Sequence, residues 1–125
     1  MRIYIAGPLS PRGIRSDTNN GAIEYVLNVR DMVRAATELI KKGHSPFCPG
    51  LDFLYFIGAL TGNEPTEVEI KAQDLEWLEV SDAIYLLPGS DQSLGAVQEY
   101  CMALSRGLQI FRNMSEIPEV KEGFE

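Results

Sequence analysis

Long apolar runs are absent from this sequence. No segment approaches the ~18 apolar residues that a membrane-spanning helix requires. The first ten residues, MRIYIAGPLS, contain too short an apolar stretch for a secretory signal peptide, and this stretch stops at Gly7-Pro8. We therefore expect a cytoplasmic protein with no membrane partner. A chain of 125 residues predicts a single domain over 1–125.

Cysteine, histidine and net positive charge are also scarce. The two cysteines, Cys48 and Cys101, lack the spacing of metal ligands and are expected to be reduced thiols. His44 is the only histidine, so a histidine-based triad would depend on it; its place at the start of a predicted strand favours a structural role. The net charge of -7 argues against a nucleic acid polymer or an anionic membrane as a partner.

What is present is an alternation of strand and helix patterns. Short apolar runs predict four strands, over 2–7, 44–49, 83–87 and 108–111. Apolar residues at helical spacing predict three long helices, over 22–40, 64–82 and 94–106. Residues 51–60 predict either a helix turn or a lid. The alternation implies parallel pairing and right-handed crossovers, hence a three-layer α/β domain with a parallel sheet of four or five strands.

The same periodicity predicts which helix faces are buried. In the first helix the predicted core face consists of positions 22, 26, 29, 33, 36 and 40. In the second helix the predicted core stripe consists of Val68, Ala72, Leu75 and Leu78. Asp74 lies on another face, between Ile70 and Trp77. Either this aspartate is half exposed beside the tryptophan, or its face looks at a pocket or a partner subunit.

The segment after the third predicted strand has the chemistry of a ligand site. Ser93, Leu94 and Gly95 would open the third helix, where unpaired N–H groups and the positive end of the helix dipole suit a phosphate. Glu99 follows about one turn later, with uncharged neighbours at three and four residues' distance. It is either a solvated glutamate or a pocket carboxylate. In a pocket, Glu99 and Asp74 would suit glycosidic chemistry, one as nucleophile and one as acid.

Several motifs carry a family resemblance when they are taken together. They are IYIAGP at 3–8, QDLEWL at 73–78, SDA at 81–83, and SLGAVQE with ALSRG within 93–107. This set resembles the nucleoside 2-deoxyribosyltransferase superfamily, and within it most closely the 2'-deoxynucleoside 5'-monophosphate N-glycosidases. The resemblance covers residues 2–111, thinly over 14–70. It implies a flavodoxin-like sheet, a homodimer, a small deoxynucleotide or deoxynucleoside as substrate, and no metal or organic cofactor.

The resemblance also implies catalytic roles. Glu99 matches a nucleophile that attacks the anomeric carbon of the deoxyribose and forms a covalent glycosyl-enzyme. Asp74 matches an aspartate that assists departure of the base, and Tyr4 matches an active-site tyrosine near the nucleophile. The implied reaction is hydrolysis of the N-glycosidic bond. Base exchange by a deoxyribosyltransferase, or nucleotide binding without catalysis, are the alternatives.

Substrate-binding roles follow from the resemblance in two loops. The implied residues are Gly7, Pro8, Arg12, Gly13, Ser93, Leu94 and Gly95. In the resembling transferases that act on free nucleosides, an aspartate occupies the position of Ser93. A serine would not repel a phosphate, so it favours a 5'-phosphorylated substrate. The chain departs from the N-glycosidase pattern at Pro8, which replaces a serine, and by two extra residues, Ser10 and Pro11, before Arg12. Val97-Gln98 also stands where Gly-Tyr is usual.

Overall fold

A parallel sheet forms the middle layer of the protein. The computed structural model describes residues 1–11, 13, 15–58 and 62–120. The strands of this part are β1 (Arg2–Ala6), β2 (Ser45–Phe47), β3 (Ala83–Leu86) and β4 (Gln109–Phe111). They lie in the order β2-β1-β3-β4, and every pairing is parallel. The predicted α/β class is thereby confirmed, with four strands in the order found in flavodoxin-like sheets.

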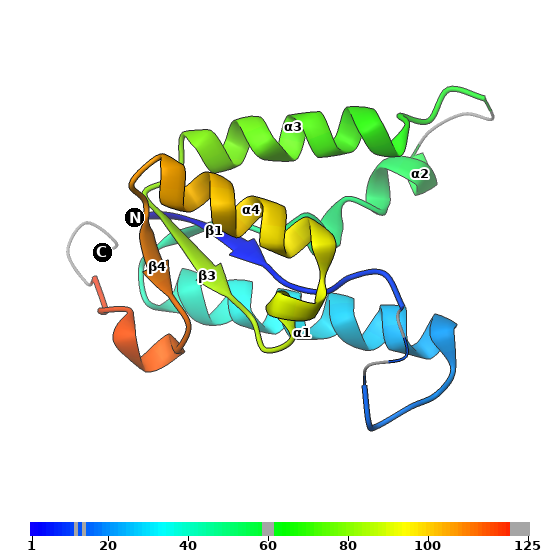
Figure 1. The fold of residues 1–125 in the computed structure, drawn as a ribbon, viewed down its shortest axis with the longest axis horizontal. Helices are drawn as coiled ribbons and strands as arrows, with labels where there is room; N and C mark the ends of the chain where they lie inside the picture. Colours follow the sequence, from blue (N-terminus) through cyan, green and yellow to red (C-terminus); the bar gives the residue numbers. More distant parts are fainter. Residues whose placement is uncertain (12, 14, 59–61, 121–125) are drawn as a thin grey trace.

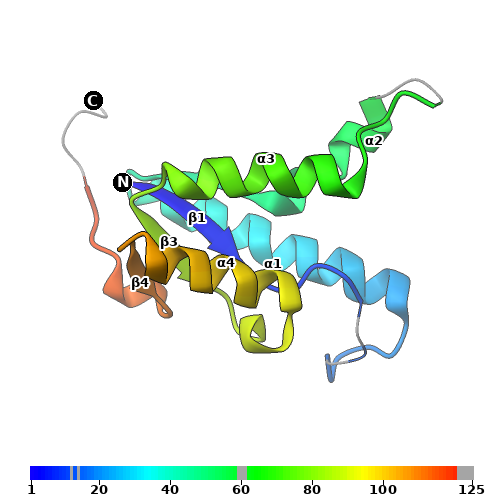
Figure 2. The ribbon, with the colours of Figure 1, turned by 45° about the horizontal axis from the view of Figure 1, so that its top comes forward.

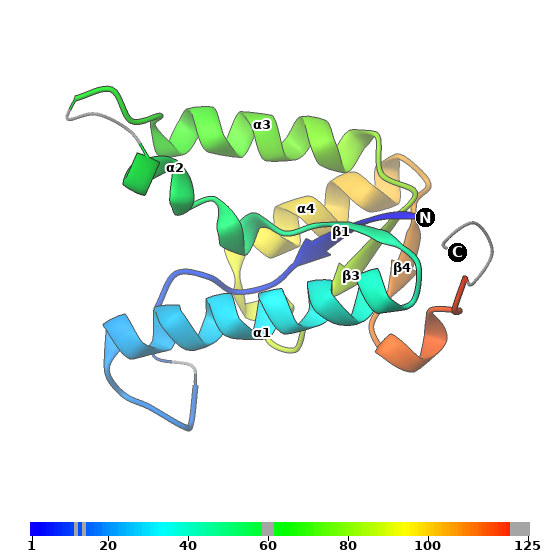
Figure 3. The same ribbon diagram turned by 180° about the vertical axis from the view of Figure 1, so that it is seen from behind.

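Helices cover both faces of this sheet (Figures 1 and 3). The helical segments are α1 (Gly21–Lys41), η1 (Pro49–Leu51), α2 (Leu54–Gly58), α3 (Glu67–Glu79), η2 (Ser90–Gln92), α4 (Leu94–Ser105) and η3 (Met114–Glu116). One face packs on α1, and the other packs on α3 and α4, which run across it next to each other (Figure 2). The three-layer prediction is confirmed. No helix within the described ranges is long and apolar enough to cross a membrane.

Alternation along β1 divides the core between the two faces. Ile3 and Ile5 pack against α1, whereas Tyr4 and Ala6 belong to the cluster under α3 and α4. All four side chains are buried, as expected for a strand of a parallel sheet that is covered on both faces. The period of two therefore places the Tyr4 ring on the same side of the sheet as α3 and α4.

Helix α1 buries a different face from the predicted one. Val26 and Ile40, two of the predicted core positions, are 63% and 59% exposed. The buried residues of the helix are Glu24, Asn28, Met32, Ala35, Ala36 and Leu39. The prediction holds at Ala36 and is wrong at Val26, because the N-terminal half of α1 runs past the end of β1 and lies against the loop that follows this strand (Figure 1). There the buried side chains bind backbone groups and Arg15 instead of packing on the sheet.

Helix α3 corrects a second face prediction. Thr66 and Glu69 form a capping box at its start, and Leu78 is fully buried. Val68 and Ala72, assigned to the core stripe from sequence, are exposed, and Leu75 is only partly buried. The first turns of the helix extend beyond the sheet towards α2, so they do not pack on the sheet (Figure 1).

Smaller expectations have mixed outcomes. His44 is buried between the N-terminal amine and the carbonyl oxygen of Pro118, which agrees with a structural role. Cys48 and Cys101 are both free. The segment predicted as a helix turn or lid contains η1 and the short α2, and its residues 59–61 lie outside the described ones. The large apolar side chains of α2 are exposed.

Leu78 and Val68 distinguish the observed face of α3 from the predicted one. Leu78→Ala should lower the free energy of unfolding by about 2–5 kcal/mol, because it leaves a cavity under the helix. Val68→Ala, at a site that is 79% exposed, should change it by less than about 0.5 kcal/mol. Urea unfolding followed by circular dichroism measures both values. Similar losses in the two variants would contradict the observed packing.

Candidate active site

A cavity of about 790 Å³ lies beyond the carboxyl ends of β1 and β3. Its lining comes from the loops after these strands, from α3 and α4, and from the connection between β2 and α2. The volume is that of a pocket for a ligand of nucleotide size. Four carboxyl side chains line it, those of Asp52, Glu67, Asp74 and Glu99, together with the ammonium group of Lys71.

Glu99 lies in the second turn of α4 and is only 7% exposed. The Tyr4 hydroxyl donates a hydrogen bond of 2.5 Å to its Oε2 atom, and Lys71 Nζ lies 3.2 Å from the same oxygen. No described residue donates to Oε1. The solvated-glutamate alternative is therefore wrong: Glu99 is a pocket carboxylate with one oxygen hydrogen-bonded and the other without a donor among the described residues.

Burial and hydrogen bonding act in opposite directions on Glu99. Burial is the largest effect and leaves the pKa of its carboxyl raised, while the Tyr4 hydrogen bond and the Lys71 charge oppose this rise in part. Burial and the neighbouring Glu99 charge raise the pKa of Tyr4 far above its ordinary value, so the phenol stays protonated and donates. The two partners thus favour the ionised form of Glu99, which is the form that can act as a nucleophile.

Asp74 has the opposite environment. Its side chain is 5% exposed, and its Oδ1 atom has no hydrogen-bond partner among the described residues. Burial, followed by the neighbouring Asp52, raises the pKa of Asp74 to about 8. At neutral pH this carboxyl is mostly protonated and can donate a proton. The half-exposed alternative considered from sequence is wrong, because this face of α3 looks into the cavity.

Sequence reasoning missed Lys71 and Asp52. Lys71 is three residues before Asp74 in α3 and therefore shares its helix face, a spacing that could have revealed it. Asp52 lies in the irregular connection between β2 and α2, where no periodic pattern exists. Its place in the cavity could not be read from its neighbours in the chain.

The segment at the start of α4 reaches the cavity in part. Ser93 caps the helix and accepts a hydrogen bond from the Ala96 N–H. Ser93 and Gly95 both line the cavity, and a Cβ atom on Gly95 would lie 3.5 Å from Lys71 Nζ. The Leu94 side chain is 63% exposed and is not part of the lining. Ser93, Gly95 and Lys71 thus form one wall of the cavity.

The described residues of the loop after β1 contribute less to the cavity lining than the sequence predicted. Gly7 lines the cavity, and a Cβ atom there would lie 2.9 Å from Leu87 Cδ1, so a larger residue would require the Leu87 side chain to shift. Pro8 is not part of the lining. Arg12 lies outside the described residues. The N–H of Gly13 donates to the Glu24 carboxylate at 3.0 and 3.2 Å, so it serves the loop structure.

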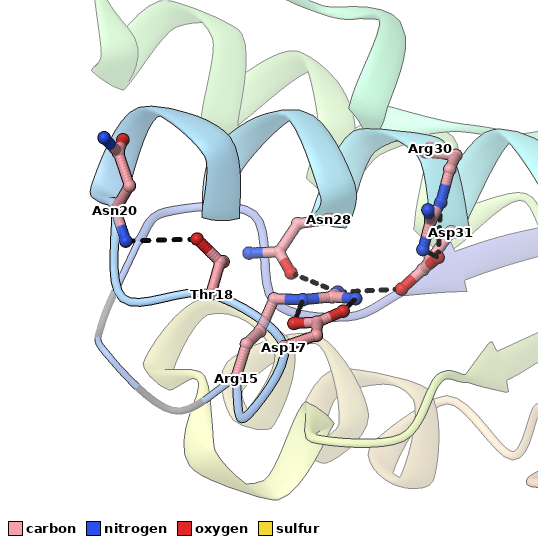
Figure 4. Close-up of polar contacts among 7 residues, drawn as sticks. All are labelled: Arg15, Asp17, Thr18, Asn20, Asn28, Arg30 and Asp31. Atoms are coloured by element: carbon pink, nitrogen blue, oxygen red, sulfur yellow. Dashed lines mark hydrogen bonds and ion pairs between the residues drawn. The ribbon is translucent and has the colours of Figure 1, made fainter.

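Arg15 connects this loop to α1 through hydrogen bonds (Figure 4). Its guanidinium donates two hydrogen bonds to the Asp17 carboxylate, at 2.8 and 2.7 Å. It also bonds Asn28 Oδ1 at 3.1 Å and Asp31 Oδ2 at 2.8 Å. The side chain is thereby used in a structural network.

The Tyr4 ring belongs to a stack of three aromatic rings. Tyr4 stacks on Phe47 with a centroid distance of 5.3 Å, and Phe47 stacks on Trp77 at 5.9 Å. This stack joins β1, β2 and α3 and fixes the ring that bonds Glu99. Phe53 and Phe56 line the cavity itself and offer apolar surface to a planar ligand. Among the residues that the structure describes, no group of three or more His, Cys, Asp or Glu side chains could hold a metal ion.

Comparison with known proteins bears on the fold. No protein-family model matches the chain, and no curated protein matches it either. A solved structure of a 2-deoxyribosyltransferase from the bacterium Bacillus psychrosaccharolyticus is similar, with a TM-score of 0.60 and 17% identity over 88% of this chain and 69% of that chain. At this identity the likeness establishes a shared fold, the flavodoxin-like one that the sequence motifs implied.

The Lys71–Glu99 ion pair can be tested without a substrate. Lys71→Met should raise the pKa of Glu99 further, because it removes the cation that favours the carboxylate. Lys71→Arg is the matched control, since it keeps the charge and should leave the pKa nearly unchanged. Carbon-13 NMR titration of the carboxyl groups, assigned with Glu99→Gln, measures the shift. An unchanged pKa in Lys71→Met would show that the pair does not form in solution.

Proposed function

We propose that this protein cleaves the N-glycosidic bond of 2'-deoxynucleoside 5'-monophosphates by hydrolysis. The observation that carries the proposal is the pairing of Glu99, anchored by Tyr4 and Lys71, with a protonated Asp74 in one cavity. A nucleophilic carboxylate and an acidic carboxyl group are the two parts that glycosidic cleavage requires. The fold shared with a 2-deoxyribosyltransferase gives independent support.

The reaction has two steps. In the first, Glu99 Oε1 bonds to the anomeric carbon of the deoxyribose while the C–N bond breaks, and its electron pair passes to the base. Asp74 supplies the proton that neutralises the departing base. In the second step, water attacks the anomeric carbon, loses a proton to Asp74, and releases Glu99 and deoxyribose 5-phosphate. Tyr4 and Lys71 hold Oε2 throughout, which keeps Oε1 oriented.

The choice of a phosphorylated substrate is supported by the wall formed by Ser93, Gly95 and Lys71. The first N–H groups of α4 carry partial positive charge, and the Lys71 ammonium lies near Gly95. A serine at position 93 places no negative charge against a phosphate. Base exchange with a second nucleobase, and nucleotide binding without turnover, remain the competing functions. Incubation with a panel of deoxynucleosides and their monophosphates, with and without free bases, separates the three.

Removal of the nucleophile gives the first activity test. Glu99→Gln keeps the size of the side chain but removes its charge, and should lower turnover by about 10³-fold or more. Glu76→Gln, the same change at an exposed position of α3 outside the cavity lining, should leave turnover unaltered. Release of free base, followed by chromatography, measures both variants. Near-normal turnover by Glu99→Gln would rule out its role as nucleophile.

Phosphate recognition is tested at Ser93. Ser93→Asp would place a carboxylate against the phosphate dianion, and should raise KM for monophosphates by at least about tenfold, since a charge-assisted hydrogen bond contributes roughly 1.5–3 kcal/mol. Free deoxynucleosides should be affected much less. Kinetics on matched pairs of nucleoside and monophosphate give the comparison. Equal effects on both, or a wild-type preference for free nucleosides, would favour a transferase.

We also propose a cytoplasmic homodimer. Trp77 is 52% exposed, and further exposed apolar side chains lie on α2 and at Val80; exposed apolar patches of this kind often mark an interaction surface. Trp77→Glu should then produce monomers with reduced activity, because a charge would be placed within the contact. Sedimentation velocity at micromolar concentration measures the change. A wild-type protein that sediments as a monomer contradicts the dimer.

A further inference from the structure

The cavity contains a carboxyl group that the two steps above leave without a role. Asp52 follows η1 as its C-terminal cap and is half-buried. It lines the cavity together with Asp74, and the two carboxyl groups are within hydrogen-bonding reach. Ionised carboxylates only accept hydrogen bonds, so a bond between these two groups requires a proton on one of them.

Burial decides which of the two carries the proton. Asp74 is the more deeply buried, and its Oδ1 atom has no donor among the described residues. An ionised Asp74 would therefore leave a buried, unpaired charge. Burial raises the pKa of Asp52 as well, but the hydrogen bond from Asp74 lowers it. The arrangement with lower free energy has the proton on Asp74 and the charge on Asp52.

Other groups around the pair act in the same direction or are already engaged. The titratable side chains that face this part of the cavity from the surrounding elements are Tyr4, Tyr25, Glu67, Lys71 and Glu99. The negative charge of Glu99 disfavours a second charge on Asp74. The Lys71 ammonium, the only cation in the described lining, is paired with Glu99 Oε2. Among the described residues around Asp74, Asp52 is the carboxyl group that reaches it with a hydrogen bond.

We propose that Asp52 is a positioning residue that keeps Asp74 protonated: the Asp52 carboxylate accepts a hydrogen bond from the Asp74 carboxyl, so that Asp74 meets the substrate as an acid. This role rests on the function proposed above. When the C–N bond breaks, the proton passes from Asp74 to a nitrogen of the base, and the pair is left with two negative charges. That repulsion favours the return of a proton, which the attacking water supplies as it bonds to the anomeric carbon. The number of protons on the pair is the same before and after turnover.

The test compares two readouts, one with substrate and one without. Carbon-13 NMR titration of the whole protein gives the pKa of Asp74, assigned with Asp74→Asn. The pH dependence of kcat/KM on the best deoxynucleotide gives the basic limb of the activity. In the wild type, the pKa of Asp74 and the pKa of the basic limb of kcat/KM should both lie near 8. In Asp52→Asn both should move down by at least about one unit, because the neighbouring charge is gone. Asp52→Glu should restore both in part.

Asp82→Asn is the matched control. Asp82 is exposed at the opposite end of the sheet, where it bonds Arg2, and its loss should leave both readouts in place. An Asp74 that titrates near the usual aspartate value of about 4 in the wild type overturns the inference, even if Asp52→Asn fails to fold. A basic limb that does not move in a folded Asp52→Asn also overturns it.

The two hypotheses fail in different ways. Normal cleavage by an enzyme whose Asp74 titrates like an ordinary aspartate refutes the role of Asp52 and leaves the proposed function standing. A raised pKa of Asp74 without cleavage of any deoxynucleotide or deoxynucleoside refutes the proposed function, and the catalytic role of Asp52 with it.

Discussion

The buried carboxylate of Glu99 needs hydrogen-bond donors, and both of its donors come from other elements. A charged group in the interior is unfavourable by several kcal/mol unless it is paired and hydrogen-bonded. Tyr4 provides the phenol from the central strand, and Lys71 provides the ammonium from α3. The contact therefore joins β1, α3 and α4 at one point. Because Lys71 and Asp74 share a face of α3, the same packing that pairs Glu99 also brings Asp74 into the cavity.

Two similar acidic side chains acquire different properties in this cavity. Glu99 has two donors on one oxygen, which favour its ionised form. Asp74 has a buried oxygen without a donor and a second carboxyl group beside it, which favour its protonated form. Burial raises the pKa of both groups, but the donors to Glu99 oppose the rise, so the two carboxyl groups can differ in protonation at one pH. The environment of each group, and not its residue type, assigns its role.

The elements of the fold could be predicted from sequence, but several of their faces could not. Strand and helix positions follow from local signals, such as the capping box at Thr66 and Glu69, and these act over a few residues. Face predictions assume that each apolar stripe meets the sheet along its whole length. The first turns of α1 and α3 run past the sheet instead (Figure 1). There α1 buries Glu24 and Asn28 against a loop, and Val68 of α3 remains exposed.

The sequence by itself determined the α/β alternation and the parallel sheet, and its motifs, through their resemblance to a known family, indicated the candidate residues Tyr4, Asp74 and Glu99. These depend on short apolar runs and compact motifs, whose physical effects are local. Only the tertiary structure decided how the candidates meet and what surrounds them. Tyr4 and Glu99 are separated by 95 positions in the chain, and Lys71 and Glu99 by 28. Such contacts arise from the packing of helices on a sheet. A pKa responds to burial and to neighbouring charges in space, so the protonation of Asp74 beside Asp52 follows from the folded chain.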